Sequence, residues 1–153
     1  MKIEDEIKGR FRNEYHKGLI NITYTAKQLS YEFYQLLKKH GLAEQQYNVL
    51  RILRGFHSEA PLSINFIKER MLDKDSDVSR IVDRLVQKAL VSRVENPKDR
   101  RQKSVEINES GLALLDKMFN CEQKADTLLS NLTLDEVKEL NQLLDKVRKK
   151  KKL

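Results

Sequence analysis

The stretch that decides the fold is SDVSRIVDRLVQKALVSRVENPKDRRQKSVEINESG, residues 76–111. In its first half, apolar residues recur every three or four positions, which predicts an amphipathic helix over residues 77–89. The period then changes to two in LVSRVE and in KSVEIN, which is typical of strands with one buried face. The Asn-Pro pair between these runs indicates a turn, so the second half predicts a β-hairpin. The residues expected on the buried face of the helix are Val78, Ile81, Val82, Leu85 and Val86.

The chain just before this stretch supplies a second short helix. Ser63 is suited to cap a helix over residues 64–72, in which Ile64, Ile67 and Met71 form an apolar stripe. The polar turn DKDS, residues 73–76, separates the two helices. Two short helices joined by a tight turn predict a helix-turn-helix, and the hairpin directly after them makes it a winged one.

Longer amphipathic helices flank this core. Apolar residues at helical spacing predict one helix over residues 5–39 and another over residues 43–56. Asn108 is a good cap for a helix over residues 109–130, and the Thr-x-x-Glu sequence that begins at Thr133 is a capping box for the last helix. The predicted fold class is therefore mainly α with a small β-hairpin.

The composition indicates a single domain of 153 residues, and its few glycines and prolines favour long helices. The net charge is +7, but the run Arg148 to Lys152 alone contributes five positive charges, so the basic balance is weak evidence for a nucleic-acid partner. No apolar run is long enough for an export signal or a membrane span, and the single cysteine fits a reducing compartment. We therefore expect a cytoplasmic protein.

Residue types that carry catalysis or hold metals are not grouped in the sequence. His16, His40 and His57 lie far apart, and no histidine, cysteine and carboxylate cluster has the spacing of metal ligands. A glycine-rich phosphate loop and a nucleophile–base arrangement are absent from the sequence as well. We expect a protein that is not an enzyme and that uses no metal or cofactor.

The polar face of the helix over residues 77–89 is rich in groups that bind DNA. In a helix-turn-helix, the N-terminal end of the second helix enters the major groove. Ser76, Ser79 and Arg80 are expected to point outward there, the serines toward phosphates or base edges and the arginine toward guanine O6 and N7. Asp77 and Asp83 would repel phosphate unless they are paired or turned aside. The alternative is an ordinary surface helix with ion pairs, such as Arg80 with Asp83 or Asp77.

The tip of the hairpin, NPKDRRQK, has four cationic residues, more than a turn requires. An arginine at such a tip has the reach to enter a narrow minor groove, where the negative potential is enhanced. Asp99 could hold either Arg100 or Arg101 through a charge-assisted fork, which leaves the other arginine free for DNA. The alternative is a solvated, charged turn. The residues expected to contact DNA are Ser76, Asp77, Ser79, Arg80, Arg84, Lys98, Arg100, Arg101 and Lys103, with Asp99 positioning the wing.

Three segments within residues 42–111 resemble the MarR family of bacterial and archaeal winged-helix regulators: LAEQQYNVLRIL, SDVSRIVDRLVQKALV and NPKDRRQKSVEINESG. The wing of that family carries an Asp-x-Arg or Asp-Arg-Arg pattern, then a strand, a helix cap and a glycine. Here, residues 99–101, Asn108 and Gly111 occupy those positions. Two residues depart from the family pattern. Ala89 stands where the family usually has glycine. Alanine costs about 1 kcal/mol there if the position needs a positive φ, and the alternative is that the helix ends differently in this chain. Asn108 replaces the usual threonine.

The resemblance implies a homodimeric transcriptional regulator, a repressor, that binds a palindromic stretch of double-stranded DNA. It also implies one MarR-like domain over residues 1–153, with the winged helix-turn-helix at 58–108 and dimerisation helices at 1–40 and 109–150. The alternative for these helices is that they simply pack on each other within one chain. The residues expected in the dimer interface are Ile22, Leu29, Phe33, Val137, Leu140, Leu144 and Val147.

Other functions stay open at this stage. Many members of the family bind a small, often aromatic effector between the dimer helices and the winged domain, and the aromatic first helix, with Tyr31 and Tyr34, could line such a pocket or pack in the core. A redox sensor acting through Cys121 is a second alternative, but the adjacent Glu122 would raise the pKa of the thiol, which favours an inert, buried cysteine. A winged-helix adaptor that binds other proteins is the third alternative.

Overall fold

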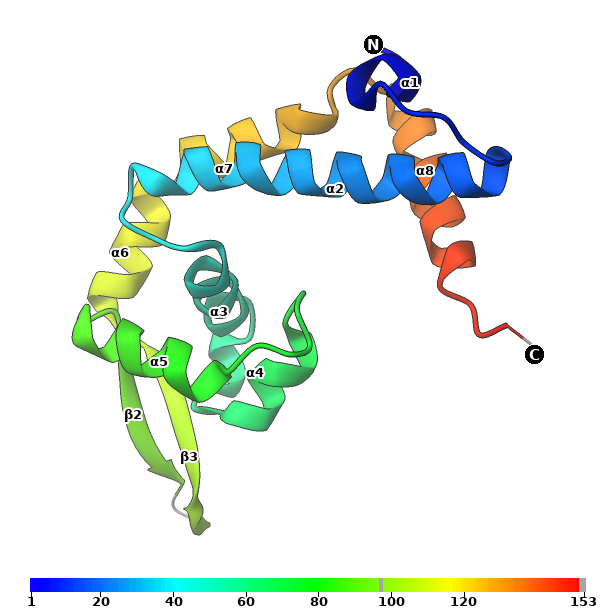
Figure 1. Cartoon of the computed structure of the whole chain (residues 1–153). Helices are drawn as coiled ribbons and strands as arrows, with labels where there is room; N and C mark the ends of the chain where they lie inside the picture. Colours follow the sequence, from blue (N-terminus) through cyan, green and yellow to red (C-terminus); the bar gives the residue numbers. More distant parts are fainter. Residues whose placement is uncertain (97, 152–153) are drawn as a thin grey trace.

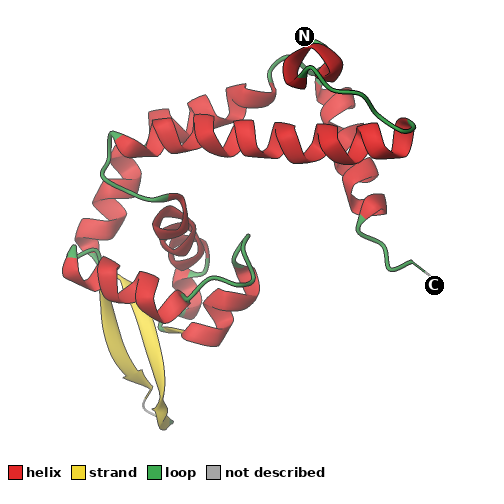
Figure 2. Ribbon diagram, viewed as in Figure 1, coloured by secondary structure: helices red, strands yellow, loops and turns green. Residues whose placement is uncertain are grey.

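The computed structural model describes residues 1–96 and 98–151, and it leaves out the side chains of Asn96 and Arg100. Within this part of the chain, long helices form an upper arm, and shorter helices form a lower winged body from which a hairpin extends (Figure 1). Figure 2 shows the strands of the hairpin in yellow. The arm consists of α1 (Ile3–Ile7), α2 (Glu14–Lys38), α7 (Phe119–Asp126) and α8 (Leu134–Val147), and the winged body of α3 (Glu44–Gly55), β1 (Leu62–Ser63), α4 (Ile64–Arg70), α5 (Val78–Gln87), β2 (Val91–Asn96), β3 (Asp99–Ile107) and α6 (Glu109–Lys117), with 3-10 turns at His57–Glu59 and Thr127–Leu129.

The winged body is built around one apolar core. α3, α4 and α5 each present their apolar stripe to this core, and all three contribute side chains that are at most 2% exposed. The side chain of Ser63 caps α4 by accepting the N–H of Phe66 at 3.1 Å. The helix-turn-helix and the hairpin after it are therefore confirmed. These side chains include Leu50, Leu53, Ile67, Val82 and Leu85.

The sheet has one more strand than the sequence predicted. Its order is β1-β3-β2, and all neighbouring strands are antiparallel. β1 pairs with β3 through Leu62 opposite Val105 and Ser63 opposite Ser104. A strand of two residues is too short to show an alternating pattern, so periodicity could not reveal it. This strand ties the start of α4 to the base of the wing.

Two of the predicted long helices are interrupted. The predicted helix over 5–39 is divided, because α1 ends at Ile7 and α2 begins at Glu14 behind a cap formed by the side chain of Asn13. The predicted helix over 109–130 bends at Met118, which separates α6 from α7, and then ends at Asp126. Met118 is fully buried, so tertiary packing and not local sequence determines the bend. The predicted last helix is confirmed, with the capping box between Thr133 and Glu136.

Val86 was predicted in the buried face of α5, and that prediction is wrong. It is 38% exposed, whereas Val78, Val82 and Leu85 are at most 2% exposed. The buried stripe of α5 is narrow, and each residue of a helix is turned by about 100° from the one before it. Val86 therefore lies beyond the edge of the stripe that Leu85 completes.

None of the helices in the described residues is both long and apolar enough to cross a membrane.

The end of α5 bears out the expectation for Ala89. This residue has a φ of 57°, in the left-handed region that glycine adopts most readily. The N–H of Ala89 donates to Val86 O at 2.9 Å and the N–H of Leu90 to Leu85 O at 3.1 Å. These two bonds form a Schellman motif, in which the left-handed residue closes the helix. Alanine at this position is strained by about 1 kcal/mol.

Replacing Ala89 by glycine relieves this strain. We expect Ala89→Gly to raise the free energy of unfolding by about 0.5–1 kcal/mol, measured by denaturant titration. The control is Gln87→Gly two residues earlier, inside α5, where glycine should lower the free energy of unfolding by up to about 1 kcal/mol. Equal destabilisation by both substitutions would contradict the strain at Ala89.

Candidate nucleic-acid interface

The exposed face of α5 carries most of the predicted groups. Ser79, Arg80 and Arg84 are exposed, as is Asp77 at the start of the helix. The carboxylate of Asp77 accepts the N–H of Arg80 at 3.2 Å and so acts as the N-cap. This bond engages Asp77 with the backbone and not with the guanidinium of Arg80. The arginine side chains remain on the outer face of the helix, beside a hollow of about 370 Å³ between α5 and the start of α3.

Ser76 does not point outward, and this prediction is wrong. Only 5% of the residue is exposed, and its hydroxyl accepts a hydrogen bond from the side-chain amide of Gln45 in α3 at 3.3 Å. Ser76 lies before the N-cap of α5, so the helical spacing that was used to assign faces does not extend to it. The serine fastens the turn of the helix-turn-helix to α3.

An ion pair between α5 and the wing engages the second acid of the helix. The guanidinium of Arg93 in β2 pairs with the carboxylate of Asp83, and it also donates to Ser79 O at 3.4 Å. The sequence suggested Arg80 as the partner of Asp83, but the wing supplies the cation. Arg93 shares one strand face with Val91, which is buried, so the alternating pattern contained a signal for this contact. The pair neutralises an acid on the outer face of α5 and fixes the wing against this helix.

The tip of the wing is cationic and exposed. Lys98, Arg101 and Lys103 are exposed, as is Asp99. The carboxylate of Asp99 accepts the backbone N–H of Arg101 at 3.0 Å, which fixes the turn and leaves the guanidinium of Arg101 outside this bond. The predicted fork between Asp99 and a guanidinium is therefore not made with Arg101. The side chain of Arg100 and all of Pro97 lie outside the described residues.

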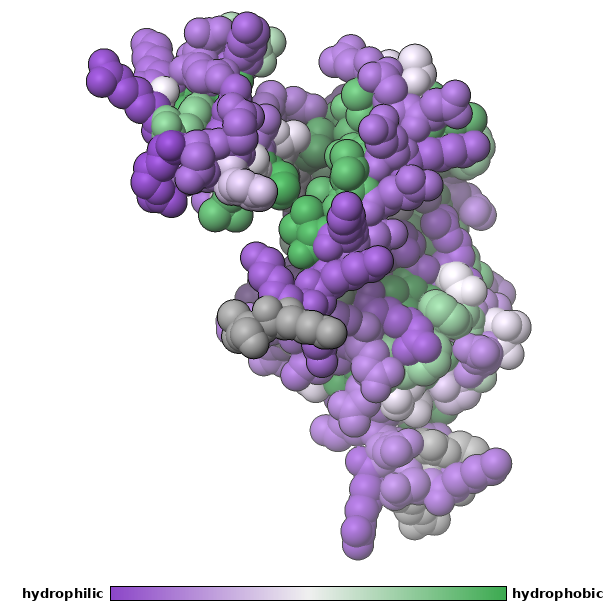
Figure 3. Space-filling model, turned by 90° about the vertical axis from the view of Figure 1, so that its right-hand side faces the viewer, coloured by the Kyte–Doolittle hydropathy of each residue, from purple (hydrophilic) through white to green (hydrophobic). Residues whose placement is uncertain are grey.

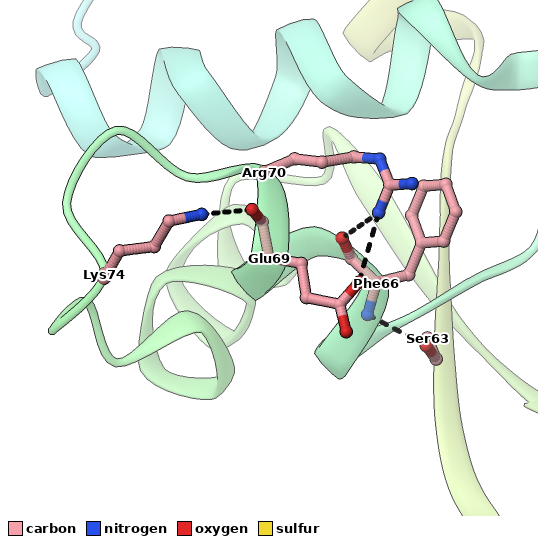
Figure 4. Close-up of polar contacts among 5 residues, drawn as sticks. All are labelled: Ser63, Phe66, Glu69, Arg70 and Lys74. Atoms are coloured by element: carbon pink, nitrogen blue, oxygen red, sulfur yellow. Dashed lines mark hydrogen bonds and ion pairs between the residues drawn. The ribbon is translucent and has the colours of Figure 1, made fainter. Parts of the chain in front are cut away.

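The first helix of the helix-turn-helix is fixed by a stacked arginine (Figure 4). The guanidinium of Arg70 lies 3.4 Å from the ring centre of Phe66 and 4.9 Å from that of Phe56. It also donates to Phe66 O at 2.9 Å, and the ammonium of Lys74 bonds Glu69 O near the end of α4. Arg70 is thus a packing residue, and α4 presents Lys68, which is exposed, on its outer side.

The apolar residues predicted in a dimer interface do not all share one surface. Ile22 and Leu29 of α2 line a groove of about 410 Å³ together with Leu140 and Leu144 of α8. The hydrophobic residues, drawn in green, gather in a hollow in the upper half of the face in Figure 3. Phe33 instead faces the winged body of its own chain, where the centre of its ring lies 5.4 Å from that of Tyr47. Val137 is half-buried and Val147 is 60% exposed at the end of α8.

Cys121 is buried, with 7% of its surface exposed. Burial raises the pKa of its thiol, and the negative charge of Glu122 raises this pKa further. A thiolate is the reactive form, so both effects make the cysteine less reactive. The expectation of a raised pKa is confirmed, and the geometry gives no support to a redox sensor.

Comparison with known proteins identifies the family. The chain is 30% identical over 112 residues to the HTH-type transcriptional regulator MhqR of Bacillus subtilis, and the matched segment covers 72% of this chain and 75% of MhqR. The model of the MarR family matches residues 40–102, from the turn after α2 into β3. The chain belongs to the MarR family.

Other MarR-family proteins agree with this assignment. MgrA of Staphylococcus aureus is 29% identical over 126 residues, which cover 81% of this chain and 83% of MgrA. The structure of wild-type MarR of E. coli in its apo form is 28% identical, with a TM-score of 0.64 over 83% of this chain and 93% of that one. BpsR of Bordetella bronchiseptica shares the fold, with a TM-score of 0.78 over 94% and 100% of the two chains at 20% identity. The protein is a MarR-family transcriptional regulator with a DNA-binding winged-helix fold, and this family consists of regulators, not enzymes.

The ion pair between the wing and α5 leads to a prediction. Arg93→Gln leaves Asp83 as an unpaired acid on the exposed face of α5 and loosens the wing. We expect weaker binding of double-stranded DNA in a titration at fixed salt, while the free energy of unfolding changes by less than about 1 kcal/mol, because the pair is partly exposed.

The double variant Arg93→Gln/Asp83→Asn separates charge from alignment. It removes the unpaired acid, so most of the lost affinity should return if repulsion dominates. A single variant that binds DNA as tightly as the unmodified protein would contradict the role of Arg93.

Proposed function

We propose that the protein is a homodimeric repressor that binds a palindromic stretch of double-stranded DNA. The observation that carries the proposal is the combined surface of α5 and the wing. Ser79, Arg80 and Arg84 are exposed on α5, while Asp77 and Asp83 are engaged by groups of their own chain. The hairpin extends beyond α5, on the side of the winged body that faces away from the arm (Figure 1). A cationic helix beside a cationic hairpin fits the two grooves of a duplex.

The residues would share the work between the grooves. Arg80, near the N-terminus of α5, has the geometry to bond guanine O6 and N7 in the major groove, with Ser79 and Arg84 at the phosphates or base edges. On the wing, Arg101 or Arg100 would enter the minor groove, and Asp99 would hold the turn that carries them. Lys98 and Lys103 would contact phosphates. Ser76 has no place in this set, because it is buried.

A second copy of the chain would supply the other half-site. A single winged helix covers little DNA, and two copies related by a two-fold axis read half-sites about 34–36 Å apart. The arm offers the surface for this contact, because Ile22, Leu134, Leu143 and Val147 are exposed apolar residues of α2 and α8, between 44% and 70% exposed. The groove between α2 and α8 would receive helices of the partner. The proposed division is a winged part at residues 58–108 and dimerisation helices at 1–40 and 109–150.

Release by a small molecule is also part of the proposal. The DNA binding of BpsR is regulated by 6-hydroxynicotinic acid, and the regulator PcaV of Streptomyces coelicolor has been solved with its natural ligand. In this chain, a hollow of about 280 Å³ lies between α2 and the end of α5 and is lined by Tyr34, Lys38 and Lys88. A small aromatic acid bound there would contact both the arm and the winged body, and it would shift the population of DNA-binding conformations.

DNA binding is the central prediction. The protein is titrated onto duplexes that it has itself selected. Its affinity for them should fall steeply as the salt concentration rises, because binding to the phosphates releases counterions. Arg80→Ala should cost about 1–3 kcal/mol and relax the preference for one base pair. Arg101→Ala should weaken binding, and Arg101→Ala with Arg100→Ala should weaken it more. Glu106→Ala, exposed at the base of β3, is the control and should leave binding unchanged.

A protein-binding adaptor would behave differently in this experiment. It would show no preference for any duplex at any salt concentration. Arginine variants of the wing that bind DNA like the unmodified protein would refute the role of the wing.

The dimer has its own test. Sedimentation equilibrium at micromolar concentration should give twice the chain mass of 18.0 kDa. Leu140→Asp together with Leu144→Asp would bring two charges into the groove between α2 and α8, so the variant should sediment as a single chain and bind single half-sites only. The unmodified protein sedimenting at 18.0 kDa would refute the dimer.

A further inference from the structure

An ion pair joins the winged body to the arm on the side where the chain bends. The guanidinium of Arg54 in α3 donates two hydrogen bonds to the carboxylate of Glu122 in α7, Nη1 to Oε1 and Nη2 to Oε2, each of 3.0 Å. The two side chains are 35% and 27% exposed. Arg54 is part of the winged body and Glu122 is part of the arm. The fork therefore connects two parts of the molecule that are 68 residues apart in sequence.

The ion pair lies beside a buried tyrosine of α3. Tyr47 lies two turns before Arg54 on the same face of α3 and is 6% exposed. Burial and the adjacent Glu122 carboxylate raise the pKa of Tyr47 to about 12. The hydrogen bonds from Arg54 lower the pKa of Glu122, so the carboxylate is charged at neutral pH. The aromatic ring of Tyr47 also meets Phe33 of α2, so the same cluster contacts α2 and α7 of the arm.

Glu122 follows directly on the joint of the chain. α6 ends at Lys117 and α7 begins at Phe119, and Figure 1 shows that these helices run in different directions. At the joint, the N–H of Met118 is shared between Leu114 O and Leu115 O, both at 3.1 Å. One turn later, the N–H of Glu122 bonds Met118 O at 2.9 Å. The ion pair thus acts on the first turn after the bend.

Apolar packing also joins the two parts across the bend. Leu37 of α2, Leu115 of α6 and Met118 belong to the same apolar core as the winged body. Apolar burial holds these parts together but is not directional. A bidentate arginine–carboxylate fork, by contrast, fixes both the distance and the orientation of its partners. The fork therefore adds an orientation-dependent restraint on the angle between arm and winged body to the packing of the core.

We propose that Glu122, held by Arg54, is a positioning residue that sets the angle between arm and winged body, and thereby the half-site spacing that the dimer accepts. This inference rests on the proposed function, because it needs two copies of α5, the recognition helix that would enter the major groove, held in place by the arms of the two subunits of a dimer. One base pair more between half-sites moves a recognition helix by about 3.4 Å along the DNA. A change of that size requires a rotation between arm and winged body, and the fork resists this rotation.

The test is a spacing series. Duplexes are built from the sequence selected by the unmodified protein, with the half-sites moved closer or apart by one and two base pairs, together with a single half-site. Glu122→Gln removes the charge at constant size, and Arg54→Lys keeps the charge but loses the fork. Asp126→Asn, at the end of the same helix, is the matched control and should behave as the unmodified protein.

We expect both fork variants to lose between about 2- and 30-fold in affinity at the optimal spacing and to discriminate less between spacings. Their affinity for the single half-site should stay unchanged. Denaturant unfolding of each variant shows whether it is folded under the binding conditions. If Glu122→Gln is not folded, Arg54→Lys is the milder change and carries the test.

Two results would overturn the inference without touching the proposed function. One is an unchanged spacing profile in both variants, and the other is an equal loss on single and paired half-sites, which indicates a merely structural role. An unmodified protein that binds single and paired half-sites equally would instead refute the proposed dimeric reading of DNA, and this inference with it.

Discussion

The carbonyl oxygen of Leu90 is the point at which the end of α5, the wing and the start of α6 are joined. A Cβ at Gly111 would lie 2.4 Å from this oxygen, so α6 can approach only with glycine there. The oxygen accepts the N–H of Asn108 at 3.2 Å. The side chain of Asn108 donates to Ala89 O at 2.9 Å and caps α6 through the N–H of Gly111, also at 2.9 Å. The end of α5, both ends of the wing and the start of α6 therefore share one set of atoms and one orientation.

Features that depend on near neighbours in sequence were predictable. The caps at Ser63, Asn108 and Thr133 follow from local rules, and the structure has all three. The positive φ of Ala89 was expected only from the family resemblance, and the structure has it too. The bend at Met118 and the burial of Ser76 depend on what packs against them. Local propensity carries no information about such contacts, since tertiary packing overrides it.

The polar contacts of the site show the same division. Arg93 and Asp83 are ten residues apart, and the alternation of the strand already places the arginine on the inner face. Arg54 and Glu122 lie 68 residues apart, so only the fold brings them together. Asp77 at the start of α5 is engaged by a backbone N–H, and Asp83 of α5 is paired with an arginine of the wing. A net charge that lies mainly in the C-terminal run would not have revealed this arrangement.

The last helix has a consequence for how the protein responds to dilution. α8, whose residues are all among those described, has no buried residue within its own chain. A helix of 14 residues is marginal in water when it is on its own. Leu134, Leu143 and Val147 of this helix stay more than half exposed despite its half-buried contacts with α2. In the proposed dimer, the partner that covers α8 also orders it, so the order of this helix would rise with protein concentration, while the winged body keeps its own core.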